Sequence, residues 1–181
     1  MKIAVSACLL VTECRYDGTA KPCEEVRALG ESHVLVPVCP ESDGGLRVPH
    51  SPNEVVTAER ALRVVDAEGA DNTDAFLAGA RKTLERVRAE GCTLAILKAK
   101  SPSCGSGRIY DGTFTGNIVP GYGVTARLLR AEGVRVLDEA QLRACLSASS
   151  VRHPGMPPAV LAESAAECPA LITERLVLRP L

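Results

Sequence analysis

Short apolar runs alternate with amphipathic segments over the first 146 residues of the chain. Apolar runs bounded by glycine or polar residues predict buried strands at 2–7, 33–38, 93–97 and 134–137. Apolar residues at helical spacing, followed by glycine or a polar end, predict helices at 22–29, 73–90, 123–132 and 139–146. Such alternation is typical of a parallel sheet with right-handed crossovers. We therefore expect an α/β fold: a mainly parallel sheet with helices on both faces, in a three-layer, Rossmann-like arrangement.

Two features refine this expectation. Pro37 lacks the amide hydrogen that a ladder needs, so the strand 33–38 is expected at an edge of the sheet. Residues 61–65 are expected to form a small peripheral strand, whereas 46–60 contain two prolines and little periodicity. The pattern thus places one sheet and a peripheral element in a single domain, residues 1–146.

Composition narrows the class of protein. The chain has 181 residues, of which 46% are hydrophobic, which is enough for one domain with a substantial core. A net charge of -1 gives no electrostatic basis for binding nucleic acid or an anionic membrane. The apolar runs are too short to span a bilayer, and the residues before Cys8 leave no room for a secretory signal. We expect a cytoplasmic protein, and the sequence leaves its oligomeric state open.

Eight cysteines suggest chemistry rather than disulfides, because cytoplasmic thiols stay reduced. Cys8 and Cys39 end the first two predicted strands, and Cys104 follows the strand 93–97. Ligands of parallel sheets bind beyond the carboxyl ends of the strands, where these three thiols converge. This favours a soft metal or an iron–sulfur cluster, although ordinary buried cysteines stay an alternative at each position. Cys92 enters its strand at the opposite end, and Cys14 is within reach of the thiols or their margin.

The segment 98–116 is unusually rich in glycine, hydroxyl and basic residues for a simple turn. Ser101 and Ser103 lie beside Cys104, and basic residues flank the loop. Such a loop is suited to surround a small polar or inorganic ligand.

Several motifs together resemble those of the thiouracil desulfurases. They are Ser6-Ala-Cys-Leu-Leu10, Cys14-Arg-Tyr-Asp-Gly18, Val36-Pro-Val-Cys-Pro-Glu41, Gly44-Gly-Leu46, Ser101-Pro-Ser-Cys-Gly105, Ile109-Tyr-Asp-Gly-Thr-Phe114 and Gly121-Tyr-Gly-Val-Thr125. The resemblance implies a [4Fe-4S] cluster bound by Cys8, Cys39 and Cys104, with one iron free to bind the sulfur of a thiolated pyrimidine. It implies an enzyme whose non-redox reaction converts C=S to C=O and releases sulfide.

The chemistry also needs a proton-transfer group and substrate contacts. A carboxylate beside the cluster can activate water; Glu41 is the first candidate, with Asp43 and Asp17 in reserve. Ser101 and Ser103 are candidates for hydrogen bonds to the substrate or to cluster sulfides. Ordinary capping or turn bonding is the alternative for each of these residues. The three histidines share no ligand spacing and are expected to be structural or exposed.

Several questions stay open at this point. Val11 replaces the glycine usual in the family, which affects the loop that carries Cys14. The substrate is a free base, a nucleoside or a nucleotide. A competing interpretation is a nucleotide-binding module, because Gly121–Ala126 fits G-x-G-x-x-A and opens a predicted helix. A zinc-binding protein that uses the same thiols is a third.

Residues 147–181 are expected to lie outside the desulfurase-like domain. Their first part is small, polar and proline-rich, as linkers are. Ile172–Leu181 resembles the opening strand of a GNAT acetyltransferase but is too short to fold or to bind acetyl-CoA. We expect a linker and a truncated fusion partner; a strand that pairs with a sheet edge is the alternative.

Overall fold

The structure, a computed structural model, describes residues 1–58 and 61–150. It divides into two compact units, Met1–Glu139 and Ala140–Leu181. The second unit contains the described part of one helix, α5 (Glu139–Ser150), which extends beyond its predicted end at Leu146. The segment resembling a GNAT strand lies outside the described residues, and the predicted boundary after residue 146 stays a prediction.

The first unit is built on a four-stranded parallel sheet. Its strands, in spatial order, are β2 (Val34–Val38), β1 (Lys2–Ser6), β5 (Leu94–Leu97) and β8 (Arg135–Asp138). The helical segments are η1 (Ala7–Leu9), α1 (Glu24–Ala28), η2 (Leu29–Glu31), α2 (Pro40–Asp43), α3 (Thr73–Ala89) and α4 (Val124–Ala131). The chain crosses from β2 over β1 to β5, which creates a topological switch point between β1 and β5.

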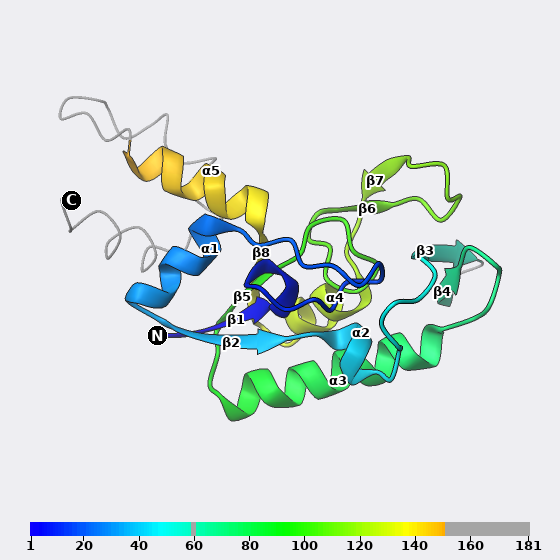
Figure 1. The fold of residues 1–181 in the computed structure, drawn as a ribbon, viewed down its shortest axis with the longest axis horizontal. Helices are drawn as coiled ribbons and strands as arrows, with labels where there is room; N and C mark the ends of the chain where they lie inside the picture. Colours follow the sequence, from blue (N-terminus) through cyan, green and yellow to red (C-terminus); the bar gives the residue numbers. More distant parts are fainter. Residues whose placement is uncertain (59–60, 151–181) are drawn as a thin grey trace. The chain divides into compact units, whose positions relative to one another are not determined.

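Alternating residues of these strands are buried on both faces of the sheet. On one face Ala4, Val36 and Ala95 pack in a cluster with residues of α3 and α4. On the other face Ile3 and Leu94 are also fully covered. Figure 1 shows α1 and α3 on opposite sides of the sheet. The predicted α/β class with helices on both faces is therefore confirmed.

The edge position predicted for Pro37 is also confirmed, because β2 pairs only with β1 in the described sheet. The predicted peripheral strand is β4 (Ala61–Asp66), which pairs with β3 (Asn53–Ala58) in an antiparallel hairpin. The sequence did not indicate β3. It also did not indicate the hairpin of β6 (Arg108–Tyr110), which lies inside the expected loop 98–116, and β7 (Ile118–Pro120), which follows that loop. The carboxyl ends of the parallel strands point toward these hairpins (Figure 1).

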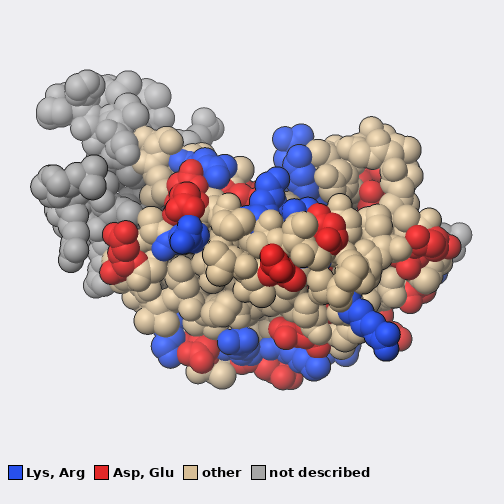
Figure 2. Space-filling view, viewed as in Figure 1, with Lys and Arg blue, Asp and Glu red and all other residues tan. Residues whose placement is uncertain are grey.

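Positive and negative side chains are interspersed over the face shown in Figure 2. This distribution agrees with the small net charge of the chain. None of the helices in the described residues is long and apolar enough to cross a membrane.

Candidate functional site

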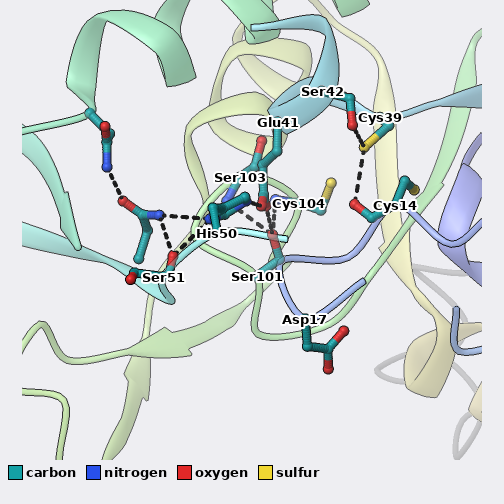
Figure 3. Close-up of polar contacts among 12 residues, drawn as sticks. Cys14, Asp17, Cys39, Glu41, Ser42, His50, Ser51, Ser101, Ser103 and Cys104 are labelled. Atoms are coloured by element: carbon teal, nitrogen blue, oxygen red, sulfur yellow. Dashed lines mark hydrogen bonds and ion pairs between the residues drawn. The ribbon is translucent and has the colours of Figure 1, made fainter. Parts of the chain in front are cut away.

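Three parallel strands deliver three cysteines to one edge of the sheet. Cys8 lies in η1 directly after β1, Cys39 is the residue between β2 and α2, and Cys104 lies in the loop after β5. Cys8 and Cys104 are buried and Cys39 is partly buried. Cys8 and Cys104 follow the two strands that flank the switch point, where the diverging connections leave room for a ligand. Figure 3 shows the Cys39 thiol directed at the carbonyl of Cys14, which comes from the loop after η1.

The loop that carries Cys104 is fixed by the start of α4. The carbonyl of Pro102 accepts a hydrogen bond from the Val124 amide, and the carbonyl of Ser103 accepts one from the Thr125 amide, both at 2.9 Å. The fully buried hydroxyl of Ser103 lies 2.8 Å from that of Thr125. A Cβ added at Gly123 would lie 2.5 Å from the Ser103 carbonyl, so only glycine permits this approach.

This packing explains the glycine motif at 121–126 without a nucleotide. The amides in the first turn of α4 donate to loop carbonyls, so they are not free for a pyrophosphate. The preceding strand, β7, belongs to an antiparallel hairpin and not to the parallel sheet that the dinucleotide fingerprint requires. The structure thus gives no support to the nucleotide-binding interpretation. The Ser103 hydroxyl bonds the Thr125 hydroxyl and so holds the loop against α4, while its expected contact with the substrate or cluster stays a prediction.

Ser101 connects the cysteine loop to the candidate acid–base group. Its Oγ accepts hydrogen bonds from the amides of Ser103 (3.1 Å) and Cys104 (3.0 Å). The hydroxyl then donates to Glu41 Oε1 at 3.2 Å. Because both loop amides use the oxygen as acceptor, the hydroxyl hydrogen is directed at the carboxylate. Ser101 therefore sets the position of Glu41 relative to Cys104.

Glu41 lies on α2, two residues after Cys39. The helix sits tightly on α3, because a Cβ at Gly79 would lie 1.8 Å from the Pro40 carbonyl oxygen. The reserve candidate Asp43 is on the same helix but makes none of the contacts that join Glu41 to Ser101. The other reserve, Asp17, bonds Thr19 within its own loop.

His50 is a site residue that the sequence analysis missed. Its Nδ1 donates to the Ser51 carbonyl at 2.7 Å, and its Nε2 lies 3.4 Å from Glu41 Oε2. The separation is that of an ion pair rather than a well-formed hydrogen bond. The interaction with Glu41 raises the pKa of His50 against the opposing effect of burial. We expected a structural or exposed histidine, and the side chain instead faces the candidate acid–base group (Figure 3).

The sequence around His50 gave little indication that its side chain faces Glu41. Asn53 braces the segment by donating to the Ser51 carbonyl at 3.0 Å, and its own side-chain oxygen accepts from Asn72 at 2.8 Å. Glu41 and His50 are brought together by the fold of the segment between α2 and β3. One feature of the sequence could have indicated His50 as a site residue. It lies between two prolines, Pro49 and Pro52, in a segment where an ordinary surface turn does not require a histidine.

The thiols at this edge influence one another. Burial raises the pKa of Cys104 to about 12, and the charges of Glu41 and Cys39 act in the same direction. Interaction with Cys14, followed by burial, also raises the pKa of Cys39. The Cys39 thiol lies 3.2 Å from the Ser42 hydroxyl and donates to the Cys14 carbonyl at 3.6 Å. Thiolates this close would repel each other, so a bound cation is needed to hold several of them ionised.

Other candidates from the sequence lie in different surroundings. Lys98, which flanks the cysteine loop, is paired with Glu139, whose carboxylate also accepts the Ala99 amide at 2.7 Å. Part of its charge is therefore offset by Glu139. Cys92 lies before β5, at the opposite end of the sheet from Cys104. Val11 is 65% exposed and does not have the positive φ that would require the glycine of the family.

Comparison with known proteins agrees with this geometry. The model of the 2-thiouracil desulfurase family matches residues 3–141. The uncharacterized protein YbbK of Bacillus subtilis (strain 168) is 43% identical over 146 residues, which cover 77% of this chain and 97% of YbbK. The solved structure of TudS, a [4Fe-4S]-dependent thiouracil desulfidase, is similar with a TM-score of 0.73 and 44% identity. That similarity covers 83% of this chain and 99% of TudS. The chain belongs to the 2-thiouracil desulfurase family.

Proposed function

We propose that this protein is a [4Fe-4S]-dependent enzyme that removes sulfur from a thiolated pyrimidine. Water and the C=S group are consumed, and C=O and hydrogen sulfide are formed without net oxidation or reduction. The family match and the solved relative support the reaction class. The observation that carries the proposal for this chain is the convergence of three cysteines from β1, β2 and β5 beside Glu41.

Cys8, Cys39 and Cys104 are the proposed cluster ligands. Burial and neighbouring thiols raise the pKa values of Cys39 and Cys104, so these side chains stay protonated when no cation is bound. A bound cation displaces the protons, and the resulting thiolates are its ligands. No group of three His, Cys, Asp or Glu side chains within residues 1–58 and 61–150 is arranged to hold a single metal ion. In an iron–sulfur cluster each cysteine thiolate binds a different iron, so three separate thiols at one edge of the sheet are compatible with a cluster.

When bound, the cluster would supply an iron that Cys8, Cys39 and Cys104 leave open, and this iron would act as a Lewis acid toward the substrate sulfur. Glu41 is the proposed acid–base group. Its carboxylate takes a proton from the attacking water and returns one to the departing sulfur. Ser101 holds Oε1 through its hydroxyl, and His50 faces Oε2, so neither oxygen is free to swing away from the thiols.

Anaerobic purification tests the proposal directly. The native protein should be brown and contain about four irons and four acid-labile sulfides per chain. It should release sulfide from at least one of 2-thiouracil, 4-thiouridine or 4-thiouridine monophosphate, and the comparison identifies base, nucleoside or nucleotide as substrate. Replacing Cys8, Cys39 or Cys104 singly by alanine should remove the cluster and the activity.

Cys92→Ala is the matched control, because it removes a buried thiol at the other end of the sheet. This variant should keep iron, sulfide and turnover. A protein that contains zinc without sulfide, or one whose cluster survives the loss of Cys104, would contradict the assignment.

A further inference from the structure

A fourth thiol lies at the same edge of the sheet and has no role in the reaction described above. Cys14 belongs to the loop between η1 and α1, and its carbonyl accepts the hydrogen bond from the Cys39 thiol. The side chains of Cys39 and Cys8 both influence the pKa of the Cys14 thiol, so the Cys14 side chain lies near both of them. Cys14 therefore contacts one proposed cluster ligand, Cys39, and lies near a second, Cys8.

The burial of the four thiols places Cys14 on the outer side of the group. Cys8 and Cys104 are buried, whereas Cys39 and Cys14 are only partly buried. A substrate must approach a bound cluster from solvent, so it would arrive on the side of the more exposed thiols, Cys39 and Cys14. Two other cysteines of residues 1–139 lie outside the proposed ligand set. Cys23 is buried with its thiol donating to Glu25 Oε2 at 3.0 Å, and Cys92 is at the far end of the sheet.

The backbone holds Cys14 in place while its side chain can still turn. The Cys14 amide bonds the Thr12 carbonyl at 2.9 Å, and the Thr12 amide bonds the Ala7 carbonyl at 3.3 Å. These bonds connect the loop to η1, which carries Cys8. Rotation about the single Cα–Cβ bond then moves the sulfur toward or away from the other thiols without moving the loop.

We propose that Cys14 is a displaceable fourth ligand of the cluster, which occupies the open iron until a sulfur ligand arrives. This inference rests on the proposed function, because it needs the cluster that Cys8, Cys39 and Cys104 would hold. In the exchange the iron–sulfur bond to Cys14 breaks, the bond to the incoming sulfur forms, and the released thiolate takes up one proton. No electron is transferred.

A ligand of this kind has two consequences. It protects the open iron, which a cluster with three cysteine ligands otherwise loses on oxidation to give [3Fe-4S]. It also competes with every sulfur ligand, because only the fraction of molecules with Cys14 released is competent to bind. If Cys14 is bound nine-tenths of the time, its removal tightens the apparent affinity for such a ligand about tenfold.

The test compares the native holoenzyme with Cys14→Ala and Cys92→Ala, each purified with its cluster under anaerobic conditions. Ferricyanide oxidation is followed by electron paramagnetic resonance of the [3Fe-4S] product, and sodium hydrosulfide is titrated by visible absorption. Cys14→Ala should keep its iron and sulfide, form [3Fe-4S] faster than the other two proteins, and bind hydrosulfide more tightly.

Two results overturn the proposal. Cys14→Ala could behave as Cys92→Ala does in both measurements, which would show that Cys14 does not reach the iron. It could instead lose the cluster, which would make Cys14 a permanent ligand. Neither result changes the rate of sulfide release by the native enzyme. The proposed function is therefore tested independently, by the sulfide-release assay.

Discussion

Gly79→Ala tests whether the seating of α2 on α3 controls the site. The added Cβ would lie 1.8 Å from the Pro40 carbonyl oxygen and 2.8 Å from its carbonyl carbon. Both atoms are backbone, so no side-chain rotation relieves the overlap. Separation to at least 3.0 Å requires α2, or the facing turn of α3, to retreat by more than an ångström.

The retreat affects catalysis more than stability. Overpacking of this kind costs about 1–3 kcal/mol, but alanine is favoured over glycine inside a helix by about 1 kcal/mol. The net loss in unfolding free energy is therefore roughly 0–2 kcal/mol. Because α2 carries Glu41 and begins at Cys39, the same displacement moves the proposed base relative to the thiols. A misplacement of about 1 Å is enough for a 100-fold loss of rate.

Two measurements separate these effects. Urea denaturation gives the change in stability, and sulfide release per cluster gives the change in rate. Gly30→Ala is the control, because its Cβ would make an ordinary contact of 3.4 Å with Leu35. If Gly79→Ala folds, binds its cluster and turns over at the rate of Gly30→Ala, then the position of α2 does not set the activity.

Three further predictions concern single side chains. Glu41→Gln should keep the fold and the cluster but lose sulfide release by about 100-fold or more; unchanged turnover would remove Glu41 from the mechanism. The pKa of His50, measured by NMR, should lie above 6.5 in the native protein and fall in Glu41→Gln. A pKa of His50 that is raised in the folded state stabilises the folded protein at pH values below the pKa of His50 in the unfolded chain, and this stabilisation is lost as the pH rises through the folded-state pKa. The difference in unfolding free energy between the native protein and Glu41→Gln should therefore shrink over that pH range. Ser103→Ala should cost about 1–3 kcal/mol, because it leaves the buried Thr125 hydroxyl without its partner; an undiminished urea midpoint would contradict this.

The sequence by itself determined the parallel sheet with its helices and the class of reaction. Apolar runs and helical periodicity are local properties, and they located all four strands of the parallel sheet. A parallel sheet has one carboxyl-end edge, so the order of strands and cysteines was enough to bring Cys8, Cys39 and Cys104 together. Several motifs in the same order then indicated the family, because they cover most of the chain.

Tertiary structure decided which polar groups meet and which are already used. The glycine motif before α4 fits a nucleotide fingerprint locally, and only packing shows that its amides bond the carbonyls of Pro102 and Ser103. The spacing of His50 in the sequence did not indicate a site residue. Its partner Glu41 is nine positions away, and the segment between them has no periodicity that would predict their contact. Short irregular segments carry little local signal, since their conformation is set by long-range contacts such as the seat of α2 on Gly79. The sequence could therefore place the thiols, whereas the acid–base arrangement beside them depended on contacts between distant parts of the chain.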